Sequence, residues 1–235
     1  GSFSDTITDH EYIFTVGLTQ LEAPLPVKLS CELITLGDQG KLHLETQKEA
    51  ADGRMSKDFE FTGNIATTGM GIFSATNASI TGSLTIEGSD DSGGDNFISL
   101  NGCDISNKNG VAVTVRNASI TLDNCTIDGN NVAITAENCQ VFISSCHLTG
   151  DTAVVLTDST MTISGDNYFS CNEYAIMTSE DNTSSALNAY DSSINITPGC
   201  KPSNNDELVQ NLKPLDSDTG EGADWDTYIY QDPAA

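Results

Sequence analysis

Two consecutive stretches of equal length decide the fold. VAVTVRNASITLDNCTIDGNN runs from Val111 to Asn131, and VAITAENCQVFISSCHLTGDT runs from Val132 to Thr152, each 21 residues long. Within each stretch, apolar residues alternate with Thr, Ser, Asn and Asp, and this period of two predicts short β-strands. Repetition at a fixed length predicts stacked copies of one structural unit.

The repeat extends to both sides of these stretches. Further copies start at Ala153, at Ala186 and, earlier in the chain, at Gly71; the pentapeptide NASIT occurs at both 77–81 and 117–121. When the copies are aligned, their apolar residues fall into columns. One column holds Ile80, Ile98, Ile120, Val141, Met161 and Ile194, another holds Leu84, Cys103, Cys125 and Cys146, and a third holds Phe61, Ile86, Ile105, Ile127, Leu148 and Phe169.

Three short strands in each repeat, stacked in register, predict an all-β protein. The expected fold is a right-handed parallel β-helix with coils of about 21 residues, in which like side chains stack about 4.8 Å apart. An antiparallel sandwich is the alternative, but it would show turn signals every 8 to 12 residues or so without such columns. No apolar run approaches the roughly 20 residues of a membrane-spanning helix.

The repeat divides the chain into three parts. Residues 1–55 do not fit it and are predicted to be an N-terminal cap or degenerate coils. Residues 56–200 form the predicted β-helix, and residues 201–235 form an acidic C-terminal tail of low apolar content. The chain begins with Gly1-Ser2 rather than Met, which is typical of a cloning scar, so we expect a segment of a longer protein.

The net charge excludes several partners. The chain has 34 acidic against 9 basic residues, for a formal net charge of −25. Such a charge repels the phosphate backbone of nucleic acids. It also disfavours a polygalacturonate lyase, because the repeat region offers only Lys108, Arg116 and Lys201 to an acidic sugar.

No catalytic residues are predicted. Asp104, Asp123 and Asp128 lie on neighbouring coils and could pair as the two carboxylates of a glycoside hydrolase, but we expect them at turns, where Asp favours the required backbone. The sequence contains no nucleophile elbow, zinc-protease or phosphate-loop motif. We therefore expect a protein that is not an enzyme.

One loop is a candidate metal site. Asp90, Asp91, Asp95 and Asn96 lie within eight residues and could hold a structural Ca²⁺ by oxygen ligands, although a solvated loop explains the same composition. The cysteine spacings include no CxxC pair and only three His are present, which argues against zinc. No other cofactor is expected.

Seven cysteines leave at least one without an intramolecular partner. The stacked Cys103, Cys125 and Cys146 are expected to be free, buried thiols, because side chains that point the same way make bridging strained. Cys171 and Cys200 are the preferred disulfide.

A pair of short motifs resembles a known family. Phe61-Thr62-Gly63-Asn64 is followed by Gly69-Met70-Gly71-Ile72, and Phe169-Ser170-Cys171-Asn172 is followed by Ala175-Ile176 without the glycines. This combination resembles the FxxN and GGA(I/L/V) tetrapeptides of the chlamydial polymorphic membrane proteins. Met70 and Gly71 depart from the second tetrapeptide.

The resemblance implies a function and a location. Members of that family are autotransporters whose secreted β-helical passenger domain passes through a C-terminal β-barrel and mediates adhesion to host cells. It therefore implies a virulence-related adhesin segment, at the outer membrane or secreted, whose partner is a host-cell receptor or glycan. The residues that it implies for binding are Phe61, Asn64, Gly69, Gly71, Ile72, Phe169 and Asn172; the physical alternative is that Phe fills the core and Asn satisfies turn backbone groups.

Three functions remain open from the sequence. A non-enzymatic adhesin would bind through several coils and through the loops at 89–96 and 178–185. A carbohydrate-binding or carbohydrate-active β-helix, like a tailspike or lyase, would need acids and aromatic platforms converging on a groove, yet the one Trp lies in the tail. A structural stalk would need neither a binding surface nor such a groove.

Overall fold

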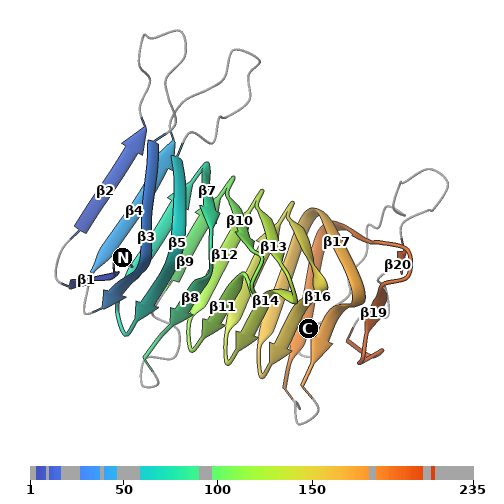
Figure 1. Ribbon diagram of the computed structural model, residues 1–235. Helices are drawn as coiled ribbons and strands as arrows, with labels where there is room; N and C mark the ends of the chain where they lie inside the picture. The colour runs from blue at the N-terminus through green and yellow to red at the C-terminus, as the bar shows by residue number, and fades with distance from the viewer. Residues whose placement is uncertain are drawn as a thin grey trace, which may run out of the picture.

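The chain forms a parallel β-solenoid, and the predicted parallel β-helix is confirmed (Figure 1). The computed structural model describes residues 4–8, 11–16, 27–37, 40–46, 59–89, 97–179, 184–208 and 213–214. All of its regular elements are strands, and no described segment is a helix able to cross a membrane. The strands are β1 (Ser4–Thr8), β2 (Glu11–Val16), β3 (Val27–Gly37), β4 (Lys41–Thr46), β5 (Phe59–Thr68), β6 (Ile72–Thr76), β7 (Ala78–Thr81), β8 (Leu84–Glu87), β9 (Phe97–Asn101), β10 (Asp104–Asn107), β11 (Val113–Arg116), β12 (Ser119–Asp123), β13 (Thr126–Gly129), β14 (Val132–Glu137), β15 (Gln140–Ser144), β16 (His147–Thr157), β17 (Thr160–Thr178), β18 (Ala186–Ile196), β19 (Lys201–Ser203) and β20 (Lys213–Pro214).

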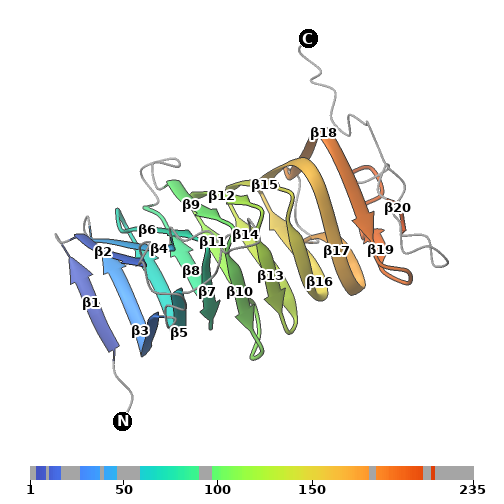
Figure 2. The same ribbon diagram turned by 90° about the horizontal axis from the view of Figure 1, so that it is seen from above.

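The strands stack into three parallel ladders along the solenoid axis (Figure 2). Ladder 1 is β2–β4–β6–β9–β12–β15–β17–β18. Ladder 2 is β3–β5–β7–β10–β13–β16–β17–β18–β20. Ladder 3 is β1–β3–β5–β8–β11–β14–β16–β17–β19. Long strands such as β17 bend around corners and contribute to more than one ladder.

Coil length varies along the axis. Side-chain hydrogen bonds between adjacent coils join residues 21 apart (Arg116 to Glu137) or 22 apart (Asn101 to Asp123) in the central part, as the repeat predicts. The separation rises to 26 between Cys171 and Thr197, and to 32 between Glu32 and Asn64. Longer coils leave room for insertions, because the ladder constrains only the strand segments.

The two ends of the chain contribute strands to the same ladders. In the region expected as a cap or degenerate coils, β1 pairs with β3, and β2 pairs with β4. In the region expected as a tail, β19 pairs with β17, and β20 pairs with β18. Residues 215–235 lie outside the described part of the chain.

The core consists of inward side chains from all three ladders, but its columns differ in part from those predicted. Phe61 stacks on Ile80, and Ile80 stacks on Ile105. Ile80 therefore belongs to the phenylalanine column of ladder 2, not to the column of Ile98 and Ile120 in ladder 1. The NASIT pentapeptide caused this error, because it starts a ladder 2 strand at β7 and a ladder 1 strand at β12.

Three further assignments to columns were wrong. Ile86 stacks between Thr67 and Val115 in ladder 3, and Leu84 lies in the same ladder rather than on the cysteines. Ile194 pairs with Asn167, because the register shifts between Ser164 and Gly165. All three side chains are buried, so the sequence predicted their burial correctly and their ladder incorrectly.

Two of the three corners depend on left-handed backbone conformations. At the corner from ladder 1 to ladder 2, φ is 50° at Asn77, 53° at Asn124 and 52° at Ser145; at the corner from ladder 3 to ladder 1, φ is 49° at Asn117 and 53° at Asn138. Asn adopts this conformation more readily than most residues. Adjacent corners also bond to each other, since Asn138 Nδ2 donates to Asn117 Oδ1 over 2.8 Å.

We predict that Asn138→Val lowers the free energy of unfolding by about 1 to 3 kcal/mol more than Asn138→Gly does, because a β-branched residue is strained at positive φ. Both substitutions remove the same amide, so their difference isolates the backbone. Urea denaturation followed by circular dichroism measures it. The control position is Gln140, an exposed residue at the start of β15. There the Gln140→Val variant should be at least as stable as the Gln140→Gly variant. If the Gly variant were the more stable one at both positions, the explanation would be refuted.

Candidate functional site

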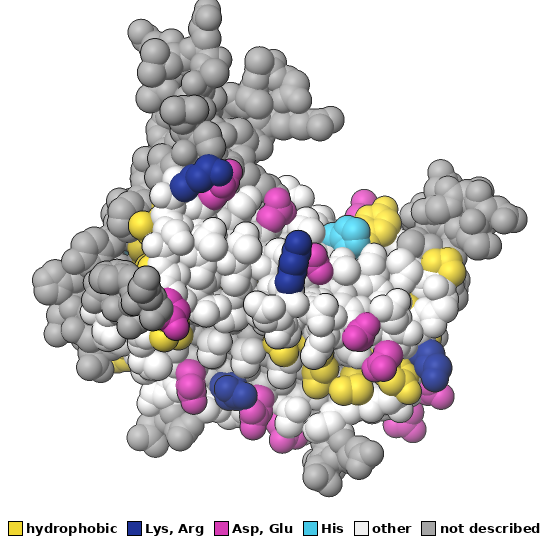
Figure 3. All heavy atoms as spheres, in the orientation of Figure 1, with side chains coloured by type: hydrophobic (Ala, Val, Ile, Leu, Met, Phe, Trp, Pro, Cys, Tyr) yellow, Lys and Arg dark blue, Asp and Glu magenta, His cyan; other side chains and the backbone are white. Residues whose placement is uncertain are grey.

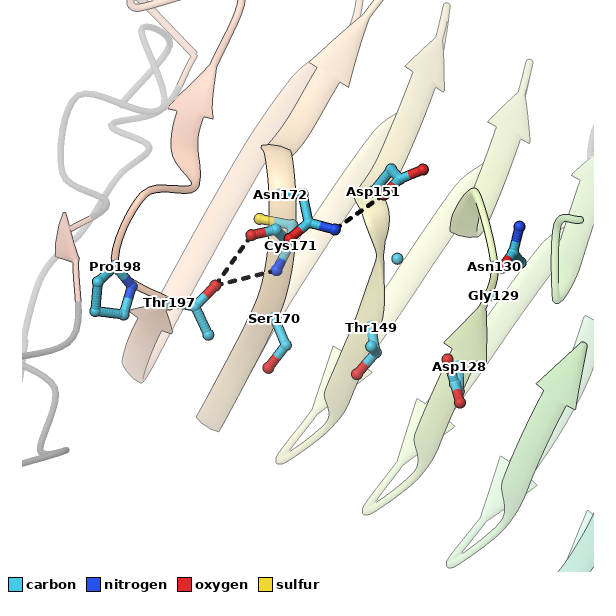
Figure 4. Close-up of a pocket in the computed structure, with 11 residues that line it drawn as sticks. Asp128, Gly129, Asn130, Thr149, Asp151, Ser170, Cys171, Asn172, Thr197 and Pro198 are labelled. Carbon is cyan, nitrogen blue, oxygen red and sulfur yellow. Dashed lines mark hydrogen bonds between the residues drawn. The ribbon is translucent and has the colours of Figure 1, made fainter. Parts of the chain in front are cut away.

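A shallow polar groove of about 430 Å³ crosses four successive coils on the outer surface of ladder 2 (Figure 4). Its lining comes from equivalent positions of β13, β16 and β17 and from the turn after β18. The lining residues are Asp128, Gly129, Asn130, Thr149, Gly150, Asp151, Ser170, Cys171, Asn172, Thr197 and Pro198. The groove therefore runs along the solenoid axis rather than around a coil.

One row of the groove consists of short polar side chains in register. Asp128 pairs with Thr149, and Thr149 pairs with Ser170. These residues point outward because each follows a core residue of the phenylalanine column: Ile127, Leu148 or Phe169. Strand register thus places a carboxylate and two hydroxyls in line, as Figure 4 shows.

A second row lies at the corner where ladder 2 ends. Asn172 Nδ2 donates to Asp151 Oδ1 on the preceding coil over 3.0 Å. Between the rows the floor is backbone, and a Cβ at Gly129 would lie 1.9 Å from the carbonyl oxygen of Val132. Only glycine fits at this point, because a larger side chain would overlap the backbone of Val132.

The C-terminal end of the groove is fixed by a disulfide and a hydroxyl. The predicted Cys171–Cys200 disulfide is confirmed, with a Cα–Cα distance of 5.3 Å. The Cys171 N–H donates to Thr197 Oγ1 over 3.1 Å, and Thr197 Oγ1 donates to the Cys171 carbonyl oxygen over 3.2 Å. The turn bearing Thr197 and Pro198 is thereby held against β17.

Two ring-bearing side chains flank the first row. His147 and Tyr168 pair across β16 and β17, two positions before Thr149 and Ser170 on the same outer face. Their ring centroids are 6.1 Å apart, and His147 Nε2 lies 2.9 Å from Ser170 Oγ. Tyr168 is 42% exposed, so the groove has an aromatic border that is not predicted from the sequence. Strand register and outward alternation were the signals that could have revealed it.

The residues of the FxxN motifs occupy two environments. Phe61 and Phe169 are each 1% exposed and belong to one core column of ladder 2. The residues stacked between them are Ile80, Ile105, Ile127 and Leu148. Asn64 is exposed and joins two neighbouring coils: its Nδ2 donates to Glu32 O over 3.2 Å, and its Oδ1 accepts the Ser83 N–H over 3.0 Å. Asn172 is also exposed, and of the seven residues predicted for binding it is the one that lines the groove.

The glycine-rich tetrapeptide forms a tight turn between β5 and β6. Gly69 has a φ of 59°, and a Cβ at Gly71 would lie 2.1 Å from Leu36 O. Ile72 follows as the first residue of β6, and its N–H donates to Gly40 O over 2.9 Å. These residues lie in the turn between β5 and β6 and at the start of β6, apart from the groove lining.

The three carboxylates considered for catalysis are not at turns, contrary to expectation. Asp104 begins β10, Asp123 ends β12 and Asp128 lies within β13. Asp123 belongs to ladder 1, where its Oδ2 accepts Asn101 Nδ2 over 3.0 Å. Asp104 and Asp128 share ladder 2 but occupy different columns. Register thus separates the three, and the second carboxylate at the groove is Asp151.

The candidate calcium ligands Asp90, Asp91, Asp95 and Asn96 lie outside the described residues. Within the described part of the chain, no group of three or more His, Cys, Asp or Glu side chains could hold a metal ion. On the face shown in Figure 3, the described surface is mostly uncharged, with acidic side chains more frequent than basic ones.

A column of cysteine thiols lies behind the corner between ladders 1 and 2. Cys103, Cys125 and Cys146 are buried and form no disulfide, as predicted. Hydrogen bonding to the thiols of Cys103 and Cys146, together with burial, raises the pKa of Cys125. Cys125 and Cys146 also donate to backbone oxygens of the preceding coil, Leu100 O at 3.5 Å and Leu122 O at 3.3 Å. The column therefore satisfies its own polar atoms within the core.

Comparison of the chain with protein-family models, with curated proteins and with solved structures gives no match.

We predict that the double substitution Cys171→Ser and Cys200→Ser lowers the free energy of unfolding by about 3 to 4 kcal/mol, because the bond closes a segment with a sequence separation of 29. Urea denaturation measures the loss. Adding a reductant should lower the free energy of unfolding of the original protein to that of the variant, and it should not change the free energy of unfolding of the variant. Equal stability of the two proteins without reductant would contradict a stabilising role for the bond.

We predict that stability falls as the pH rises above about 9. A thiol whose pKa is raised by folding ionises first in the unfolded chain, so its stabilisation is complete below the ordinary pKa of 9.0 and is lost at higher pH. Cys125→Ala should reduce the alkaline slope by about 1.4 kcal/mol per pH unit. Urea denaturation of both proteins at pH values between about 7 and 10.5 measures how stability depends on pH. Parallel curves of stability against pH for the two proteins would refute the prediction.

Proposed function

We propose that this chain is a non-enzymatic adhesin segment, displayed on a cell surface or secreted, that attaches to a receptor or glycan of a host cell. The proposal joins the resemblance of the FxxN and glycine-rich motifs to a recessed site on the described surface that several coils build together. The observation that carries it is the groove along ladder 2, with its two in-register rows of polar side chains.

The build of the groove suits attachment to an extended partner. Parallel stacking repeats equivalent side chains at about 4.8 Å along the axis, so a long ligand meets similar groups on each coil. Asn172 and Asp151 hold each other in place through their hydrogen bond, and the disulfide anchors the end wall. Such preorganisation lowers the entropic cost of binding.

A carbohydrate-active enzyme is the second candidate, because Asp128 and Asp151 both line the groove on adjacent coils. A glycoside hydrolase needs two carboxylates about 5 to 9.5 Å apart on either side of the scissile bond. Release of reducing ends from a glycan that the protein binds, abolished by Asp128→Asn, would favour this candidate over the adhesin.

We predict that the double substitution Asp151→Ala and Asn172→Ala reduces attachment of protein-coated beads to cultured epithelial cells about tenfold or more. It removes one wall of the groove but no core residue. The control is Asn101→Ala with Asp123→Ala, since this pair makes the same type of amide–carboxylate bond between adjacent coils, also at 3.0 Å, on ladder 1.

The control variant should attach like the original protein, and soluble original protein should block attachment of the beads. Equal losses in the two variants would indicate general destabilisation of the coils rather than a site. Saturable attachment that neither variant changes would place the binding surface away from the groove.

A further inference from the structure

The shape of the groove restricts the form of its ligand. The lining comes from four coils spaced about 4.8 Å apart, so the groove extends about 14 Å along the axis. It is shallow and open to solvent, and the side chains that line it follow one another from coil to coil (Figure 4). A linear molecule with repeated polar groups matches it better than a compact one.

The chemistry of the lining restricts the class of ligand further. The side chains offer hydroxyls, amides and carboxylates, from Thr149, Ser170 and Thr197, from Asn130 and Asn172, and from Asp128 and Asp151 respectively. No large aliphatic side chain lines the groove, so it lacks the apolar pockets that anchor a peptide. Hydroxyls, amides and carboxylates are suited to a ligand that carries many hydroxyl groups of its own.

Charge excludes acidic ligands. Two carboxylates and no Lys or Arg occur among the residues that line the groove, and the whole chain has a formal net charge of −25. Lys201 lies beyond the disulfide, where its ammonium is 5.4 Å from the ring centre of Tyr174. A uronate, sialylated or sulfated chain would therefore be repelled.

The aromatic border supplies the remaining contact that a sugar needs. Tyr168 is exposed beside the first row, and His147 lies 2.9 Å from Ser170 Oγ. An aromatic ring offers an apolar face with a polar edge, which suits a pyranose ring whose C–H groups cluster on one face and whose hydroxyls point outward.

We infer that the ladder 2 groove binds an uncharged, linear glycan lying along the solenoid axis, with a sugar ring against Tyr168 and its hydroxyls on the two polar rows. The inference rests on the proposed function, which it narrows from a receptor or glycan to one class of glycan.

The test is a glycan array probed with the full chain, carrying neutral, acidic and amino-sugar chains, run in parallel with bead attachment to epithelial cells. We expect binding to neutral chains only. Tyr168→Ala should weaken it roughly tenfold, whereas Tyr190→Ala should not change it. Tyr190 is a matched control because it is 45% exposed on β18, against 42% for Tyr168, and pairs with Ser164 in ladder 1.

Ser170→Ala is the second variant, and it should weaken the same binding while the thermal transition stays unchanged. Preference for acidic chains, or neutral binding that survives both Tyr168→Ala and Ser170→Ala, would overturn the inference. Cell attachment without glycan binding would overturn the inference but would agree with the proposed adhesin function. Neutral glycan binding without cell attachment would support the inference and overturn the adhesin.

Discussion

The structure depends on one constraint, the parallel backbone ladder between successive coils. Each coil must place its strands one hydrogen-bonding distance from the coil before it, so equivalent side chains of neighbouring coils are forced into contact. Whatever occupies an inward position must tolerate a similar neighbour above and below. Aliphatic residues, stacked thiols such as Cys125 between Cys103 and Cys146, and buried Phe61 and Phe169 satisfy this condition in different columns.

The same constraint acts on the outer face, where it builds the groove from single residues of four coils. Asp128, Thr149 and Ser170 line up because Ile127, Leu148 and Phe169 line up inside. Asn172 meets Asp151 for the same reason. The motif that resembles an adhesin signature therefore has two physical parts: a phenylalanine that fills the core and an asparagine that joins neighbouring coils at the surface, as both Asn64 and Asn172 do.

Local sequence patterns predict where strands and corners occur, but they do not predict which ladder a strand joins. NASIT at 77–81 and 117–121 has the same local structure in both copies, with a left-handed Asn followed by a strand. One copy nevertheless starts β7 in ladder 2 and the other starts β12 in ladder 1. For this reason the predicted column of Ile80 is wrong. The coil with β7 is also short, since Asn64 and Ser83, which bond between adjacent coils, are only 19 residues apart. Asp104 and Asp128 were assigned to turns because composition cannot tell an outward strand position from a turn.

By itself, the sequence determined the period and the strands of the central repeat, the burial of its apolar columns, the column of thiols without a disulfide and the Cys171–Cys200 pair. Alternation and repeat spacing are properties of the chain read in order. The tertiary structure alone decided which coil positions are neighbours. It separated Asp123 from Asp128, brought Asp151 to Asn172, and set Tyr168 and His147 beside a polar groove. The reason is physical: coils of different length meet through backbone register, and register is fixed between strands by hydrogen bonds rather than within any one of them.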